Sequence, residues 1–299
     1  MGFSGLMKNL QGLPGQSLAV AWGVDEGVLK ACSAAVEQGL LREVCVTGPP
    51  AEIQALAAKA EVDLGPFSIV PAANPVEGAA LAVSLAKKGR CSVLMKGNLS
   101  TSIILRAVLN KEHGIRAQAL LSHIAVVELP GPRLALLTDA AMNIRPELPD
   151  KVQILNNAID FAWSIGLENP KVAVLAAVET VNPQMPETLD AAALSQMGRR
   201  GQFVKPAIVD GPLAFDNAFS KEAALQKKIE STVAGEADIF LVPEIVSGNI
   251  LYKAFSYLGY LPTSGLIYGA SCPIVLVSRA DSMESKLNGI AVACQALRE

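Results

Sequence analysis

The chain has 299 residues, of which 51% are hydrophobic and 5% aromatic, and its net charge at pH 7 is −3. This length predicts one large or two medium domains with a sizeable core. The charge and the few aromatic residues argue against a general nucleic-acid surface, and no apolar run reaches the roughly 18 residues of a membrane span.

The histidines and cysteines exclude further classes. Two histidines, His113 and His123, are too few for a multi-histidine metal site, so we expect no metal. Five cysteines at unrelated spacings indicate reduced thiols rather than a disulfide framework. The first residues lack a secretory leader. We therefore expect a cytoplasmic protein.

Short strands alternate with helices through the first third of the chain. Strands are expected at 17–22, 43–47, 67–70 and 91–95, and helices at 24–38, 51–60, 75–89 and 103–112. This alternation is typical of a mainly parallel sheet with helices on both faces, so we expect an α/β fold.

A basic junction follows the fourth strand. Lys96 ends the strand, Ser100, Thr101 or Asn98 can cap the next helix, and Arg106 lies about one turn inside it. Ligands of open parallel sheets bind beyond the carboxyl ends of the strands, so this junction is a candidate anion site. The alternative is that Lys96 and Arg106 are surface charges.

The pattern changes at Leu120. Residues 124–128 and 134–138 predict a β-hairpin with a Pro-rich turn, which indicates a second domain. Beyond it we expect strands at 172–176, 207–209 and 237–242, and helices at 150–165, 189–200, 221–230 and 247–257. Asp150 and Asn249 are the expected N-caps of the first and last of these helices.

A second anion-binding pattern lies near the C-terminus. A β-branched run at 274–277 delivers Ser278 and Arg279 to a helix expected at 282–297. Exposed amides at a helix start attract anions, and arginine adds a planar charged fork. The alternative is an ordinary strand-to-helix turn with a solvated arginine.

Five segments, in the same order, resemble the signatures of the phosphate acetyl/butyryl transferase family. The longest has a V-A-G-x-A strand leading to a proline, an acidic residue and later G-N-I-x-Y-K. The segments are Lys96–Ser102 with Arg106, Thr138–Met142, Asp210–Ala218, Val233–Lys253 and Pro273–Arg279. The K-G-N motif and the overall length resemble the butyryltransferase branch of the family, and the phosphate acetyltransferase branch is the alternative.

The resemblance implies a two-domain fold like that of isocitrate and isopropylmalate dehydrogenases, with the active site in the interdomain cleft. Residues 1–118 and 269–299 are expected to form the first domain, and residues 119–268 the second. The last strand and helix are then expected beside the Lys96 junction.

The activity implied is transfer of a short acyl group, such as butyryl, between coenzyme A and phosphate. Ser278, Arg279 and Arg106 match the catalytic residues of the family. The resemblance implies that Arg279 binds phosphate or the carbonyl oxygen, that Ser278 makes a hydrogen bond near the sulfur, and that Arg106 is a second phosphate-binding arginine. The expected substrate-binding residues are Lys96, Gly97, Asn98, Ser100, Thr101, Asp139, Asp210, Asn249 and Glu284.

One departure from the family concerns the general base. Acetyltransferases place an aspartate seven residues after the serine, where this chain has Ser285; Asp281 and Glu284 are the nearby alternatives. A third arginine of the family falls in a segment that is shorter here and has no assigned counterpart, and Lys96 is a candidate to supply its charge. Structural roles fit three of these residues equally well: Asn249 as a helix cap, Asp210 as a turn former and Asp139 as a cap of the segment after it.

The expected partners are acyl-CoA and phosphate as substrates, with no tightly bound cofactor, no nucleic acid and no membrane. A homodimer or larger homo-oligomer is expected, with the second domain on the dimer side. Two alternatives stay open: a metal- and NAD(P)-dependent decarboxylating dehydrogenase of the same fold, and a non-catalytic acyl-CoA- or phosphate-binding protein.

Overall fold

The computed structural model describes residues 1–278 and 281–297. The chain divides into two compact units, Met1–Ala119 with Ser264–Glu299, and Leu120–Thr263. The second boundary lies earlier than residue 268 because β10 (Thr263–Tyr268) pairs with β11 (Ile274–Val275) of the first unit. The sequence-based boundary had assigned the chain to the first domain again only from Gly269 onward.

The first unit has a mainly parallel sheet with strand order β3-β2-β1-β4-β11-β10. Only the β10–β11 pair among these described strands is antiparallel. The remaining strands are β1 (Gln16–Ala21), β2 (Leu41–Gly48), β3 (Phe67–Pro71) and β4 (Val93–Lys96). The order reverses direction between β1 and β4, so the loops after these two strands flank a topological switch point.

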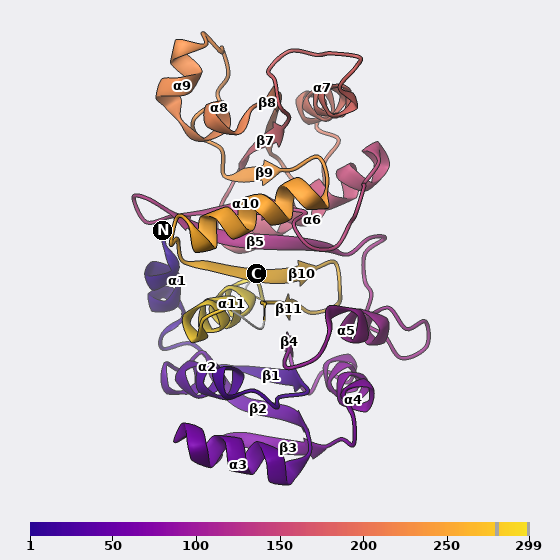
Figure 1. Cartoon of the computed structure of the whole chain (residues 1–299), viewed down its shortest axis with the longest axis vertical. Helices are drawn as coiled ribbons and strands as arrows, with labels where there is room; N and C mark the ends of the chain where they lie inside the picture. The colour runs from indigo at the N-terminus through magenta and orange to yellow at the C-terminus, as the bar shows by residue number, and fades with distance from the viewer. Residues whose placement is uncertain (279–280, 298–299) are drawn as a thin grey trace. The chain divides into compact units, whose positions relative to one another are not determined.

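Helices cover both faces of this sheet. In Figure 1, α1, α11, α2 and α3 follow one side, and α4 and α5 the other. Their bounds are α1 (Phe3–Leu10), α2 (Glu26–Glu37), α3 (Pro50–Ala60), α4 (Pro75–Lys87), α5 (Thr101–Val108) and α11 (Met283–Gln295). Side chains of Asp25 and Asn74 cap α2 and α4 by accepting bonds from first-turn amides.

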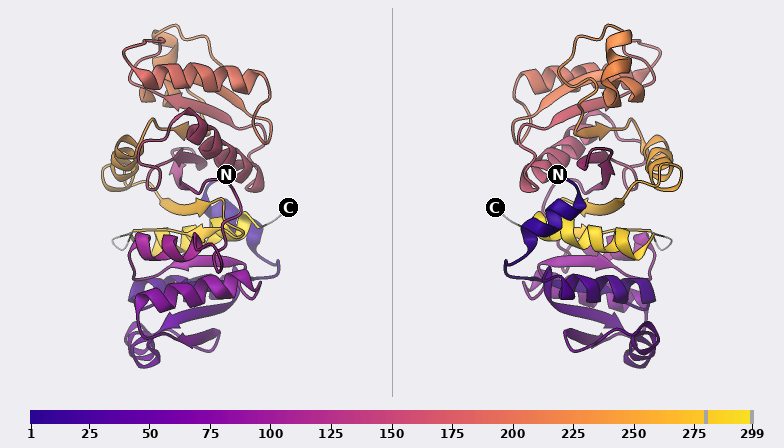
Figure 2. Two further views of the ribbon diagram at one scale, coloured as in Figure 1. Left: turned by 90° about the vertical axis from the view of Figure 1, so that its right-hand side faces the viewer. Right: turned by 90° about the vertical axis from the view of Figure 1, so that its left-hand side faces the viewer.

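The first helix was not anticipated from the sequence. Phe3, Leu6 and Leu10 of α1 are buried, and their spacing is that of one helix face. Figure 2 shows α1 lying against α11. The helices α1 and α11 therefore pack together within the first unit.

The second unit has the strand order β5-β6-β9-β7-β8. The predicted hairpin is present as the antiparallel pair β5–β6, joined by residues 130–132, and the other described pairs are parallel. The strands are β5 (Ser122–Leu129), β6 (Arg133–Thr138), β7 (Lys171–Leu175), β8 (Ile208–Leu213) and β9 (Ile239–Leu241).

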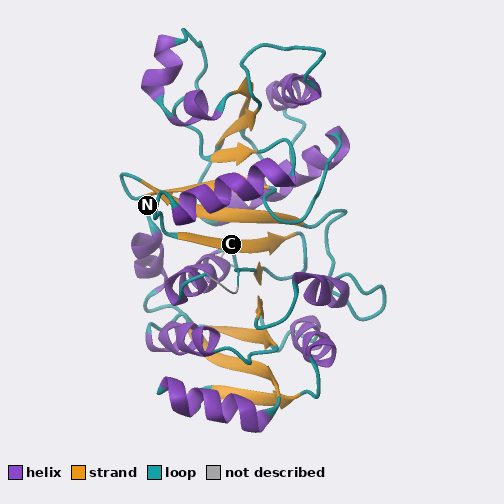
Figure 3. Cartoon of the chain, viewed as in Figure 1, coloured by secondary structure: helices purple, strands orange, loops and turns teal. Residues whose placement is uncertain are grey.

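Both faces of this second sheet are covered as well. Val127 and Phe240 share one core with residues of α8, α9 and α10, whereas α6 and α7 pack on the strands through other contacts. The helices are α6 (Leu148–Ser164), α7 (Pro186–Arg199), α8 (Phe215–Phe219), α9 (Lys221–Gln226) and α10 (Ile245–Tyr257). Figure 3 shows the same alternation of helices and strands in each unit. The predicted α/β class with mainly parallel sheets is confirmed.

One predicted helix start in this unit is wrong by three residues. Glu147, rather than Asp150, is the N-cap of α6, and the two side chains form a reciprocal capping box. Asp150 therefore bonds back to the cap instead of being the cap.

Two chain-wide features complete the fold. No helix in residues 1–278 and 281–297 has the length and apolarity to cross a membrane. All five cysteines are free thiols and buried.

Candidate active site

Two of the predicted junctions lie at the same edge of the first sheet. β4 and β11 are parallel neighbours, with Leu94 opposite Ile274 and Met95 opposite Val275. The chain therefore leaves both strands at their carboxyl ends, with Gly97 following one strand and Ser278 close behind the other. This adjacency follows from strand order, which a linear sequence does not show.

Lys96 is buried at the end of β4. Its side chain is 5% exposed, and Nζ donates to the carbonyl oxygens of Gly97 (3.1 Å) and Leu99 (3.3 Å). A buried ammonium needs such acceptors because desolvation disfavours its charge. Lys96 is thus no solvated surface charge; it binds the loop that follows its own strand.

Gly97 lies against the loop after β1. A Cβ atom at Gly97 would be 2.2 Å from the carbonyl oxygen of Trp22, and its N–H donates to the carbonyl oxygen of Ala21 at 2.9 Å. Asn98 adds two bonds: its N–H donates to Trp22 O (2.8 Å) and its Nδ2 to Val24 O (3.0 Å). Only glycine allows this approach, so the loops at the switch point are joined through Gly97 and Asn98. The β1 loop had carried no sequence signal of its own.

The helix after this loop is shorter than expected. Ser100 is its N-cap, but the Ser100 hydroxyl lies 2.9 Å from that of Ser102 and makes no capping bond. Thr101 begins α5, and Arg106 is exposed in its last turn. The exposed guanidinium fork is available for an anion, as a phosphate-binding role requires.

Shortly after β11, Ser278 and Asp281 are joined by two hydrogen bonds. Asp281 Oδ2 accepts from the Ser278 N–H at 2.7 Å, and the Asp281 N–H donates to the Ser278 carbonyl oxygen at 3.1 Å. Arg279, the other member of the predicted pair, lies outside the described residues. Asp281 was named from sequence only as an alternative base; the structure gives its carboxylate a backbone donor.

The start of α11 accounts for the remaining predicted residues of this edge. Ser282 is the N-cap and accepts from the Ser285 N–H at 3.1 Å, and the two hydroxyls lie 3.2 Å apart. Glu284, in the first turn, is exposed. Ser285, which stands in place of the family aspartate, therefore takes part in the cap.

In the second unit, Asp139 organises the loop after β6. It is 1% exposed; Oδ1 accepts from the amides of Ala141 and Met142 (2.9 Å each). Oδ2 accepts from the His123 N–H at 3.1 Å and from Asn143 Nδ2 at 2.6 Å. This satisfies both oxygens, so Asp139 shapes the loop directly, as the cap alternative had suggested.

Asn249 is not the N-cap of its helix, contrary to prediction. Glu244 is the cap, accepting from the Val246 and Ser247 amides at 2.7 Å each, and α10 begins at Ile245. A glutamate reaches these amides because the residue has extended backbone. Asn249 Nδ2 instead donates to Ala140 O at 3.3 Å.

Asp139 and Asn249 are brought together, whereas Asp210 is not. β6 and β9 are parallel neighbours, and a Cβ at Gly248 would be 2.8 Å from Asp139 O, so α10 starts directly on the Asp139 loop. Asp210 lies within β8, opposite Ala173 of β7, where it lines a cavity of about 390 Å³ with residues of 198–199 and 230–232. It is therefore in mid-strand, away from the strand ends.

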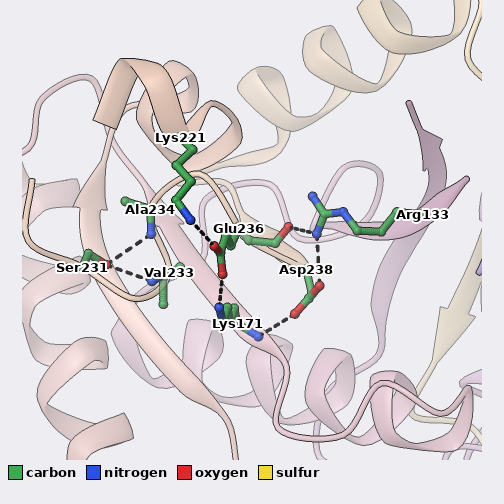
Figure 4. Close-up of polar contacts among 9 residues, drawn as sticks. Arg133, Lys171, Lys221, Ser231, Val233, Ala234, Glu236 and Asp238 are labelled. Atoms are coloured by element: carbon green, nitrogen blue, oxygen red, sulfur yellow. Dashed lines mark hydrogen bonds and ion pairs between the residues drawn. The ribbon is translucent and has the colours of Figure 1, made fainter. Parts of the chain in front are cut away.

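The first half of the longest signature lies at the opposite edge of this sheet. Figure 4 shows Glu236 between Lys171 and Lys221, and Asp238 between Arg133 and the backbone of Lys171. Lys171 and Arg133 begin β7 and β6, so the network joins the amino ends of the parallel strands. This part of the signature is structural, while its Gly248–Asn249 part reaches the carboxyl edge.

The network predicts a pH-dependent effect of Glu236→Gln on stability. The hydrogen bond from Lys171, followed by that from Lys221, lowers the pKa of Glu236 from 4.5 to about 2. A lowered folded-state pKa adds stability above the ordinary pKa, and this is lost as pH falls through the range from 4.5 to about 2. We expect the variant to melt below the wild type at pH 7 and the difference to shrink at pH 3.

Differential scanning calorimetry at the two pH values checks this expectation. Glu61→Gln, at the exposed C-cap of α3, is the control and should change neither melting temperature. An equal gap between wild type and Glu236→Gln at both pH values would contradict the role of the ionised carboxylate.

The comparisons with known proteins agree on one family. A family model described as phosphate acetyl/butaryl transferase matches residues 72–294. The chain is 47% identical to a phosphate butyryltransferase of Clostridium acetobutylicum, over 93% of this chain and 92% of the relative. It is 44% identical to a phosphate acetyltransferase of Rhizobium meliloti, over 92% of this chain and 86% of the relative.

Solved structures give the same result for the fold. A branched-chain phosphotransacylase from Enterococcus faecalis is 32% identical, with a TM-score of 0.84 over 95% of this chain and all of that one (100%). A 4-hydroxythreonine-4-phosphate dehydrogenase from Klebsiella pneumoniae is 14% identical, with a TM-score of 0.58 over 94% of this chain and 99% of that chain. The second likeness shows the shared dehydrogenase-like fold alone.

Proposed function

Because the chain belongs to the phosphate acetyl/butaryl transferase family, we propose that it transfers a short acyl group between coenzyme A and inorganic phosphate. The reaction is acyl-CoA + phosphate = acyl phosphate + CoA. The observation that carries this is the identity of 47% with a phosphate butyryltransferase over more than nine-tenths of both chains. Butyryl or a similar chain is the proposed acyl group.

The chemistry needs orientation and charge stabilisation more than covalent catalysis. A phosphate oxygen attacks the thioester carbonyl carbon, the new C–O bond forms and the C–S bond breaks. The thiolate leaves with the electron pair and takes up the proton that the attacking phosphate gives up, which yields CoA. Orientation of the reactants contributes roughly 7–11 kcal/mol in favourable cases, and one oxyanion donor about 3–4 kcal/mol. A set of fixed cations and hydrogen-bond donors suits this reaction.

We assign roles on the first unit accordingly. Arg279 and Arg106 bind phosphate and the developing oxyanion, and Ser278 donates near the thioester sulfur. The loop of Gly97 and Asn98 lies after β4, next in the sheet to β11, which supports one anion-binding surface at this edge. Lys96 contributes its positive charge beneath that loop, and Ser100 and Thr101 offer hydroxyls at the start of α5.

The remaining residues are proposed to contact the rest of the substrate. Asn249 is exposed beside the Asp139 loop and is suited to contact coenzyme A. Asp139 acts through that loop. Asp210 has less support as a substrate contact than these residues, because it lies in the middle of β8 and not at a strand end. Glu284, exposed in the first turn of α11, is the proposed base, since the Asp281 carboxylate is already bonded to Ser278.

The proposal extends to cofactors and assembly. Coenzyme A and phosphate act as substrates, with no tightly bound cofactor and no metal. The protein works in the cytoplasm, which the five buried free thiols support, and as a homodimer or larger homo-oligomer with the second unit on the dimer side.

A panel of acyl-CoA substrates tests the function. Thiol release from acetyl-, propionyl-, butyryl- and isobutyryl-CoA is followed with and without phosphate. We expect release that depends on phosphate and is fastest with a four-carbon chain. Lack of release with every substrate would overturn the proposal, and calorimetric binding of CoA without turnover would then identify a non-catalytic binding protein.

A further inference from the structure

A lysine is buried near the start of α11 where stability alone does not favour one. Lys286 is 4% exposed, although lysine is almost never fully buried unless paired. It also lies in the fourth position of α11, near the positive end of the helix dipole, where a cation is unfavourable. An apolar side chain of similar length would avoid both costs, so the ammonium needs another explanation.

The ammonium contacts the chain next to Ser278. Lys286 Nζ donates to the carbonyl oxygen of Asp281 at 2.6 Å. Asp281 in turn accepts from the Ser278 N–H through Oδ2 and donates its own N–H to Ser278 O. One bond therefore separates Lys286 from a residue that is bonded twice to Ser278.

The first turn of α2 lies next to this ammonium. A Cβ at Gly27, in the first turn of α2, would lie 3.6 Å from Lys286 Nζ and 3.3 Å from Asp25 Oδ1. Asp25 is the N-cap of α2, and its Oδ1 accepts from the Val28 N–H at 2.8 Å.

We propose that Lys286 is a positioning residue for the acyl transfer reaction, acting through Asp281 on Ser278. This rests on the proposed function. The ammonium fixes the Asp281 carbonyl, Asp281 fixes the backbone of Ser278, and the Ser278 hydroxyl is thereby held for the transition state. Misplacement of a reacting group by about 1 Å costs as much as 100-fold in rate, so a bond of this kind affects kcat more than substrate binding.

The test compares Lys286→Met and Lys286→Arg with the wild type. Methionine keeps the length and removes the charge. We expect Lys286→Met to lower kcat at least about tenfold, within the range that misplacement produces, with the KM for acyl-CoA within about twofold and no fall in melting temperature. Lys286→Arg keeps the charge and should recover part of the lost kcat.

Lys151→Met is the matched control. Lys151 is also a buried lysine, 5% exposed, but it pairs with Asp190 at 2.6 Å in the second unit. Its loss should lower the melting temperature and leave the kcat of the folded enzyme unchanged, because a carboxylate is left without its partner.

Two results would overturn the assignment: a kcat for Lys286→Met within twofold of the wild type, or a loss in Lys286→Arg as large as that in Lys286→Met. The activity of the wild type distinguishes these results from failure of the proposed function. A wild type that is inactive on all acyl-CoAs contradicts the function itself, whereas an active wild type leaves only the role of Lys286 in question.

Discussion

Arg279→Ala is expected to lower kcat by about 100- to 1000-fold, the loss that follows removal of one preorganised donor to a developing oxyanion. An arginine binds phosphate or a carbonyl oxygen through a planar fork with a permanent charge, which alanine does not reproduce. We expect the melting temperature to stay within a few degrees of the wild type. Steady-state kinetics with butyryl-CoA and phosphate, together with calorimetry, measure both effects.

The control for this prediction is Arg200→Ala. Arg200 is the exposed C-cap residue of α7 in the second unit, and its loss removes the same charge from the chain. We expect full activity. Phosphate-dependent turnover of Arg279→Ala equal to that of the control would refute the assignment of Arg279.

Arg106→Ala is expected to raise the KM for phosphate about 10- to 100-fold, the equivalent of one lost charge-assisted hydrogen bond. Arg106 is exposed in the last turn of α5, so its replacement by alanine, a better helix former, should leave stability unchanged. The measurement is the initial rate against phosphate concentration at saturating acyl-CoA.

Lysine at the same position separates charge from geometry. Arg106→Lys keeps the charge but cannot bind phosphate through two parallel N–H groups, so we expect it to recover only part of the affinity. An unchanged KM for phosphate in Arg106→Ala would show that this arginine lies away from the substrate.

Local patterns account for most elements of the fold. The short apolar runs ending near Ala21, Thr47 and Met95, each followed by a helix, correctly predicted β1, β2 and β4, because strand–helix alternation leaves few arrangements other than a parallel sheet. The hairpin with Pro130 and Pro132 was equally visible. The start of α10 was wrong because asparagine was favoured as a cap and Glu244 was overlooked.

The sequence by itself determined the α/β class, the strand-to-helix junctions at Lys96 and Ser278, and the family, since these depend on residue types and their order along the chain. Only the tertiary structure decided that β11 lies beside β4, that Gly97 meets Trp22, and that Lys286 reaches Asp281. These contacts depend on which strands and helices become neighbours, and packing of the whole unit sets that. The sequence alone does not distinguish a buried lysine from a surface lysine, because burial depends on which elements pack around the side chain.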